Sequence, residues 1–203
     1  MKIVCLTQRP IQALILTYLL GSKDIFFDHV FYCPLKKKKL LNFADEGSHS
    51  WNALKYQCEI LKIPFNKITD VNNKNFLKIL KQIKPDCMIS LVVDTIVSEE
   101  IISIFKKGVF SSHGGMLPEY RGRDSGMWAI LNNEKYAGIS LQRMNKGIDT
   151  GEIVKVSKLP LKKFKNINDI DKKLYYHFKL GDFVKLIQLI KKNKKIKFLK
   201  KKG

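Results

Sequence analysis

Residues 87–113 have the sequence CMISLVVDTIVSEEIISIFKKGVFSSH, in which two apolar runs flank a short segment with a polar start. The first run, CMISLVV, has apolar residues on both faces of a strand, which is typical of a strand covered by helices on both sides. Ser98 is a favourable N-cap for a helix that extends to Phe105. The second run, Gly108–His113, predicts another buried strand. A strand, a helix and a strand in this order indicate an α/β fold with a mainly parallel sheet.

The flanking sequence continues this alternation. Before residue 87 we expect strands at Lys2–Leu6, Phe27–Cys33 and Ile63–Ile68, and helices at Ile11–Leu20, Ser48–Leu61 (capped by Ser48 or Ser50) and Asn75–Ile83. After residue 113 we expect helices at Ser125–Asn132 and Asn166–Lys192, and strands at Ala137–Met144 and Gly151–Ser157. Ligands of such sheets bind beyond the carboxyl ends of the strands, which here are Thr7–Pro10, Val92–Thr95 and Ser111–Pro118.

The composition is that of a globular protein. Apolar residues make up 45% of the chain, an ordinary share for a packed core. No apolar run approaches the ~20 residues that span a bilayer. Gln8, Arg9 and Pro10 interrupt the apolar N-terminus, and no small-residue cleavage site follows them. We therefore expect a cytoplasmic protein without membrane association.

The cysteines give no sign of a metal site or a disulfide framework. Cys5, Cys33, Cys58 and Cys87 are widely spaced, with no C-x-x-C pair and no histidine at ligand spacing. A free thiol in apolar surroundings behaves as a small hydrophobic side chain. We expect free thiols and no bound metal.

The formal net charge of +20 is unusual, and it raises the possibility of nucleic-acid binding. Many of the lysines lie in the run Lys36–Lys39 or near the C-terminus, at positions 191, 192, 194, 195, 197 and 200–202. Too few aromatic residues border these runs to form a base-stacking platform. Attraction of a small phosphate-bearing substrate explains the charge as well, so we do not expect a nucleic-acid partner. Residues beyond about Ile196 are expected to be loose, and the basic tail after Lys194 is expected to be dispensable for chemistry. The choice between a monomer and a homodimer stays open.

A histidine and an aspartate stand in two glycine-rich turns. His113 ends an apolar strand and enters the turn Gly114-Gly115, where backbone amides can approach a substrate without Cβ interference. Asp149 lies in the turn Gly147–Gly151 between two predicted strands. A histidine that exchanges protons needs a partner to orient it, and Asp149 is the candidate. Taken singly, each residue is also explained as a structural histidine or an ordinary turn aspartate.

The segment between them carries a longer pattern. It contains HGGMLPEYRG (113–122), WAILNNE (128–134), GISLQRM (138–144) and GIDTGEI (147–153). These ordered motifs resemble the formyltransferase family that uses 10-formyltetrahydrofolate. The resemblance is close over residues 108–154 and rests mainly on strand order before them. It implies a Rossmann-like sheet flanked by helices and an enzyme that transfers a one-carbon formyl group to an amine.

The resemblance also implies the catalytic residues. The family uses Asn-x-His completed by the aspartate of the D-T-G turn, which places His113 and Asp149 in those roles. Ser111 occupies the asparagine position, and this is a departure, because a serine hydroxyl is shorter than a carboxamide. Three alternatives stay open. Ser111 acts through a water, another donor replaces the asparagine, or the site is weakened or repurposed. A Ser-His-Asp hydrolase is disfavoured, because Ser111 lies within a strand and lacks the G-x-S-x-G elbow.

The binding residues follow from the same resemblance. It places 10-formyltetrahydrofolate against Leu91, Val92, Val93, Thr95, Ile96, Gly147, Ile148 and Asp149. Substrate contacts are expected from Arg9, Gly114, Gly115 and Arg121, where Arg121 either holds an anionic group or braces its loop. Trp128 is expected to pack.

The acceptor is expected to be a small amine, most plausibly a nucleotide-linked amino sugar. Thr7–Pro10 lacks the phosphate loop of the purine-pathway enzyme, and the stretch after Ile153 is too short for the second domain of the enzymes that formylate methionyl-tRNA. A methionyl-tRNA formyltransferase-like enzyme and a folate-binding domain without turnover remain alternatives. We assign residues 1–160 to the catalytic domain and 161–203 to a C-terminal helix and lysine-rich tail.

Overall fold

The computed structural model describes residues 1–34, 48–91, 93–163 and 180–199. The chain divides into two compact units, Met1–Val109 and Phe110–Gly203. Three predicted features lie outside the described residues: the run Lys36–Lys39, Val92, and the first part of the predicted helix Asn166–Lys192.

The first unit contains a parallel sheet. Its strands β1 (Ile3–Thr7), β2 (His29–Tyr32), β3 (Phe65–Lys67) and β4 (Cys87–Leu91) lie in the order β3-β2-β1-β4. Every residue of β1 and β4 is buried, as expected of strands covered on both faces. The α/β class and the parallel pairing predicted from the apolar runs are confirmed.

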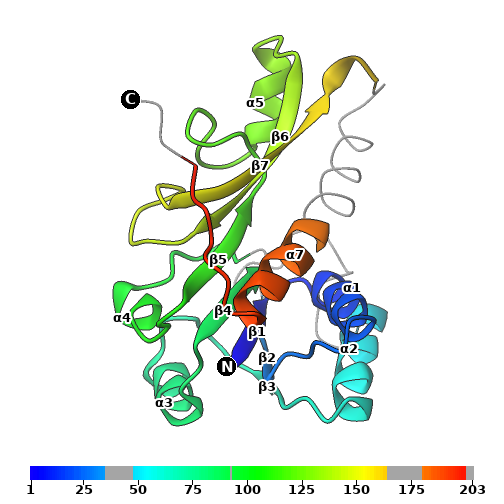
Figure 1. Cartoon of the computed structure of the whole chain (residues 1–203), viewed down its shortest axis with the longest axis vertical. Coiled ribbons are helices and arrows are strands. Elements are labelled where there is room, and N and C mark those ends of the chain that lie inside the picture. Colours follow the sequence, from blue (N-terminus) through cyan, green and yellow to red (C-terminus); the bar gives the residue numbers. More distant parts are fainter. Residues whose placement is uncertain (35–47, 92, 164–179, 200–203) are drawn as a thin grey trace. The chain divides into compact units, whose positions relative to one another are not determined.

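Helices cover both faces of this sheet. In Figure 1, α1 (Pro10–Gly21) and α2 (His49–Ile60) lie on one side of the strands, while α3 (Lys74–Ile83) and α4 (Glu99–Ile102) lie on the other. Side-chain oxygens cap three of the helices: Ser48 accepts from Trp51 N at 3.3 Å, Asn73 from Phe76 N at 2.8 Å, and Ser98 from Ile101 N at 3.4 Å. Of the two serines considered for the start of α2, Ser48 is therefore the cap.

Strand pairing in the second unit is antiparallel. β5 (Gly108–His113), which begins at the end of the first unit, pairs through Phe110–His113 with β6 (Tyr136–Arg143). β6 pairs with β7 (Glu152–Pro160), which extends three residues beyond the predicted Ser157. The unit also contains α5 (Ser125–Leu131), the short 3-10 turn η1 (Leu161–Lys163) and α7 (Leu180–Lys191). The last of these is the described part of the predicted helix Asn166–Lys192.

The end of the described chain packs against β6 and β7, so the expectation of a loose segment beyond Ile196 is wrong for residues up to 199. Leu199 N donates to Ile153 O at 2.7 Å, and the Arg143 guanidinium lies 4.6 Å from the centre of the Phe198 ring. The missed signal is the pair Phe198-Leu199, which interrupts the lysines with two apolar side chains.

The four cysteines are buried and free. Burial raises the pKa of the Cys58 thiol to about 11 and that of Cys87 to about 12, so both stay protonated near neutral pH. Of the helices within the described ranges, none has the length and apolar content to cross a membrane.

Candidate active site

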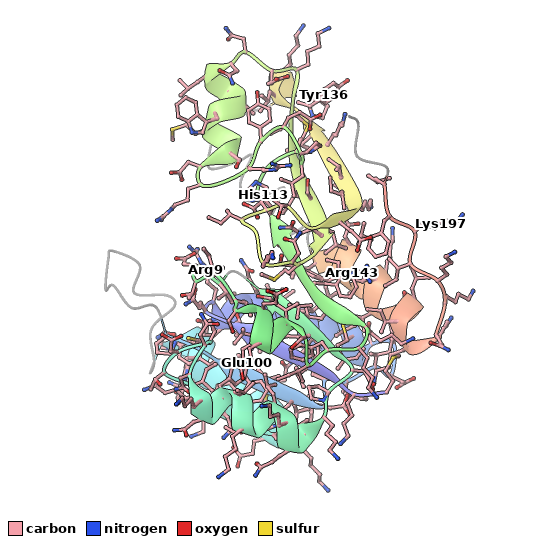
Figure 2. All side chains as sticks on the ribbon, turned by 90° about the vertical axis from the view of Figure 1, so that its left-hand side faces the viewer. Arg9, Glu100, His113, Tyr136, Arg143 and Lys197 are labelled. Carbon is pink, nitrogen blue, oxygen red and sulfur yellow. The ribbon has the colours of Figure 1, made fainter. Side chains whose placement is uncertain are left out.

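His113 is held at the end of β5 by contacts to both ring nitrogens. His113 is labelled in Figure 2. Its side chain is 8% exposed. Nδ1 lies 3.2 Å from Asp149 Oδ2, and Nε2 lies 2.5 Å from the backbone oxygen of Tyr120. Ser125 Oγ is 3.1 Å from the same Nε2 and donates to Gly122 O at 3.0 Å. The structure therefore brings together the two residues that the motifs predicted as partners.

These contacts define where the ring carries its protons. A carbonyl oxygen only accepts, so Nε2 must donate to Tyr120 O. Only the doubly protonated ring can also donate from Nδ1 to Asp149. A proton gained or released by His113 is therefore carried at Nδ1, between the ring and Asp149. The sequence predicted Asp149 as the partner of His113, and the structure adds a second contact, Tyr120 O, on the opposite side of the ring.

Three groups contact the Asp149 carboxylate. Gln142 Nε2 donates to Oδ1 at 2.9 Å, Gly122 N donates to Oδ2 at 3.1 Å, and His113 Nδ1 lies beside Oδ2. The backbone of Asp149 has a φ of +50°, a conformation that aspartate and asparagine tolerate better than most residues. The carboxylate is 19% exposed, so it is accessible from solvent while being held at both oxygens.

The turn after His113 requires a glycine at position 115. A Cβ there would lie 2.6 Å from both Tyr120 O and Ser125 Cβ, and 2.9 Å from His113 Nε2. Ser140 on β6 holds the same turn, because its Oγ donates to Gly115 O at 2.7 Å and accepts from Leu117 N at 2.9 Å. Gly114 is half-buried beside it. This close packing places the backbone of the turn against the imidazole.

Asn145 holds the turn that presents Asp149. Its Oδ1 accepts from Gly147 N at 3.0 Å and from Thr150 Oγ1 at 2.7 Å, and its Nδ2 donates to Thr150 O at 3.2 Å. Ile148, one of the predicted folate contacts, is 59% exposed at the tip of this turn. The turn therefore offers an apolar side chain and a carboxylate on adjacent residues.

Ser111 and Arg121 also belong to the second unit. Ser111 is half-buried on β5 and lies in register with Gln142 of β6. Arg121 is exposed, and its side chain has no partner among the residues that the structure describes. The contacts of Arg121 therefore do not support the alternative in which it braces its loop. Trp128 on α5 is exposed, so the expectation that it packs is wrong.

The other predicted binding residues belong to the first unit. Arg9 precedes α1, where its backbone N donates to Thr7 Oγ1 at 3.0 Å, and its side-chain Nε is buried without a partner in the described part of the chain. After β4, Leu91 is buried, Val93 and Thr95 are half-buried, and Ile96 is 57% exposed. Val92 lies outside the described residues.

Two polar residues that sequence reasoning missed hold this segment. Gln8 Oε1 accepts from Asp94 N at 2.6 Å. Asn72 donates to Ile96 O and accepts from Ser98 N, both at 2.8 Å. Gln142, Ser125, Ser140 and Asn145 were missed in the second unit. Gln142 alone had a signal, as a long polar side chain within the alternating strand GISLQRM.

The described residues contain no group of three or more His, Cys, Asp or Glu side chains that is placed to hold a metal ion. The site brings together a carboxylate–imidazole pair and closely packed glycine backbone. Such a pair holds or moves a proton next to a reacting group.

Comparison with known proteins gives a match to the formyl transferase family model over residues 52–177. The bifunctional polymyxin resistance protein ArnA of Wigglesworthia glossinidia brevipalpis is 30% identical to the chain over 162 residues. That stretch is 80% of this chain but 22% of ArnA, so the chain spans about a fifth of this relative's length.

Solved structures share the fold. A phosphoribosylglycinamide formyltransferase from Anaplasma phagocytophilum has a TM-score of 0.75 and 14% identity, covering 95% of this chain and 88% of its own. A sugar N-formyltransferase from Shewanella has a TM-score of 0.68 and 16% identity, covering 99% of this chain and 74% of its own. The Rossmann-like fold expected from the motifs is confirmed, although likeness at this identity does not distinguish the acceptors of the two enzymes.

Proposed function

Because this chain belongs to the formyl transferase family, we propose that it transfers a formyl group from 10-formyltetrahydrofolate to the primary amine of a nucleotide-linked amino sugar. The observation that carries the proposal is the His113–Asp149 pair, with 3.2 Å between Nδ1 and Oδ2. We place the catalytic domain in residues 1–160, and the C-terminal helix and lysine-rich tail in 161–203.

The pair provides the proton transfer that this reaction needs. The amine nitrogen bonds to the formyl carbon, the bond from that carbon to N10 of the folate breaks, and the amine loses a proton while N10 gains one. A site that holds a proton at His113 Nδ1, beside Asp149, serves both proton steps. The backbone at Gly114 and Gly115 lets the formyl group approach the ring closely.

The formyl donor would contact two segments, Leu91–Ile96 and Gly147–Asp149. Bound 10-formyltetrahydrofolate supplies the activated formyl group. Each segment presents an exposed isoleucine, Ile96 at 57% and Ile148 at 59%. Exposed apolar side chains suit a flat ring system, and the Gln8 and Asn72 contacts hold the first of these segments in place.

The proposed acceptor is argued from the net charge of the chain and from Arg9, in the loop after β1. Arg9 has a buried guanidinium nitrogen without a partner among the described residues, which suits an anionic ligand such as a diphosphate. Arg121 is exposed and unpaired within the same described ranges, which favours its anion-holding role. A chain of net charge +20 attracts phosphate-bearing substrates.

The experiment offers the purified full chain 10-formyltetrahydrofolate with three acceptors in turn: a panel of nucleotide-linked amino sugars, glycinamide ribonucleotide and methionyl-tRNA. Release of tetrahydrofolate and the mass of the product are measured. We expect turnover with an amino sugar. Turnover with glycinamide ribonucleotide or methionyl-tRNA alone overturns the proposed acceptor but keeps formyl transfer.

Binding of the donor is measured separately with 5-formyltetrahydrofolate, which should raise the melting temperature by mass action on the folded state. No shift at saturating ligand overturns the proposed donor. A shift without turnover on any amine supports the alternative of a folate-binding domain that lacks activity.

Ser111 separates an adapted site from a weakened one. Ser111→Ala should lower kcat by about 10²-fold or more if the hydroxyl donates directly to the oxyanion, and only modestly if a water does so. A gain of turnover in Ser111→Asn identifies a weakened relative of the family, and a loss with donor binding unchanged identifies a site adapted to serine. Unchanged kcat in both variants would show that Ser111 is not part of the active site.

A further inference from the structure

Gln142 lies on the same strand face as the proposed catalytic residues. In the pairing of β5 with β6, Ser111 is opposite Gln142 and His113 is opposite Ser140. Residues opposite each other across two strands share a face, as do residues two apart on one strand. Gln142 is 4% exposed, so its carboxamide is buried directly beside the site. The next residue, Arg143, ends the strand (Figure 2).

Among the described residues, the Gln142 amide makes one hydrogen bond, and its partner is Asp149. Its Nε2 donates to Oδ1 at 2.9 Å, while the other carboxylate oxygen receives Gly122 N and faces His113 Nδ1. Without Gln142, Oδ1 would lose the only donor that the described residues give it. The carboxylate would then be held at Oδ2 alone, by Gly122 N and His113 Nδ1, and it could turn about its Cβ–Cγ bond away from the orientation that pairs it with the imidazole.

The orientation of the amide is imposed by Asp149. Gln142 Oε1 is buried without a hydrogen-bond partner among the described residues. Turning the amide over would direct its oxygen at a carboxylate oxygen, which also only accepts, so the observed orientation is the one that the carboxylate permits. A buried carbonyl oxygen without a partner is costly, and here the hydrogen bond from Nε2 to Asp149 accounts for the orientation that leaves it unpaired.

The surrounding backbone is shaped to hold this side chain. The register of β6 against β7 shifts between Leu141 and Gln142, and such irregularities often redirect a side chain next to an active site. Gly151 gives the amide oxygen its space, since a Cβ at that position would lie 3.0 Å from Oε1 and would also collide with Arg143 O.

We propose that Gln142 is a positioning residue for formyl transfer, which holds the Asp149 carboxylate in the orientation that pairs it with His113. The inference rests on the proposed function, because the pair is the proton-transfer group of that reaction. Gln142 itself touches neither substrate. Its removal should therefore affect the chemical step and leave the binding of donor and acceptor unchanged.

The test compares Gln142→Met with the matched control Gln57→Met. Both substitutions exchange a glutamine whose Oε1 is buried and unpaired for an unbranched apolar side chain of similar length, but Gln57 lies on α2 in the first unit. We expect Gln142→Met to lower kcat by about 10- to 100-fold, the range usual when the partner that orients a functional group is lost. The KM values of both substrates should stay within about twofold, and Gln57→Met should match the wild type.

Gln142→Glu adds a second criterion. It keeps the shape of the side chain and, at a pH high enough to ionise both carboxyl groups, it faces Asp149 with an acceptor instead of an N–H donor. Its kcat at that pH should therefore fall below that of Gln142→Met. Equal kcat values in the wild type and Gln142→Met overturn the proposal, and so does a loss in Gln142→Met that appears only in KM.

Spectra of the ligand-free protein separate failure of this inference from failure of the proposed function. The ¹⁵N shifts of the His113 ring, assigned by their absence in His113→Ala, should change in Gln142→Met and not in Gln57→Met. If the His113 ring signal moves in Gln142→Met but the protein formylates no amine, the positioning role is kept and the proposed reaction is rejected. A ring signal that is unchanged in Gln142→Met rejects the positioning role.

Discussion

At the scale of single residues, His113 and Asp149 should behave as one functional unit. A general acid–base group contributes about 10²–10⁴ in rate, and residues that act together lose activity non-additively. We expect His113→Ala and Asp149→Asn each to abolish most of kcat, with the double variant little worse than either. Asparagine is the suitable replacement at 149, because it tolerates the φ of +50° that alanine would find strained.

The control for these variants is the melting temperature with and without 5-formyltetrahydrofolate, which checks that fold and donor site survive. Near wild-type kcat in either single variant would show that the altered residue has no catalytic role. Losses that multiply in the double variant would show two independent groups instead of one pair.

At the scale of elements, the pairing of β2 with β3 should make the first unit sensitive to acid. His29 on β2 stacks on Phe31 with 4.2 Å between ring centres, and its ring Nε2 lies 2.6 Å from Asn66 Oδ1 of β3. Burial lowers the pKa of His29, and the Asn66 hydrogen bond opposes this only partly. The unfolded chain takes up a proton near pH 6.5, whereas the folded protein resists it. Stability should therefore be full above pH 6.5 and fall as the pH drops toward the lower pKa of the folded state.

Melting temperatures of the wild type and His29→Gln between pH 7.5 and 5 measure this effect. The variant cannot gain the proton, so its melting temperature should fall less over the same range. Because other groups titrate equally in both proteins, the difference between the two curves isolates His29. Parallel curves would mean that His29 has the same pKa folded and unfolded.

At the scale of the whole molecule, the C-terminal lysines and the residues just before them should differ in importance. Removal of residues 200–203 takes away Lys200–Lys202 and should change neither the melting temperature nor kcat. Truncation after Lys194 also removes Phe198 and Leu199, with their contacts to Arg143 and Ile153. One cation–π contact and one hydrogen bond together contribute roughly 1–2 kcal/mol.

Such a loss should lower the melting temperature by roughly 2–8 °C in a chain of this size. Thermal unfolding of both truncated proteins and of the full chain measures it, with formylation assayed on the small amine and on methionyl-tRNA. Loss of activity on methionyl-tRNA alone after removal of residues 200–203 would favour a tRNA substrate. Equal stability of all three proteins would show that Phe198 and Leu199 contribute nothing to the fold.

The sequence by itself determined the features that depend on local pattern. The apolar run at Cys87–Leu91 predicted a strand covered on both faces, and Ser98 predicted the start of α4. Both features depend on residues that are neighbours in the sequence. The ordered motifs of residues 113–153 predicted His113 and Asp149 as partners and the family to which the chain belongs.

Only the tertiary structure decided which atoms face those residues. The contact of Tyr120 O with His113 Nε2, the contact of Gln142 with Asp149 and the packing of Phe198 on Arg143 join positions that no periodicity relates. Alternation along a strand assigns Gln142 to a face, but strand register and turn conformation decide what lies opposite it. The physical reason is that a hydrogen bond depends on a few tenths of an ångström, which long-range packing defines and local sequence does not.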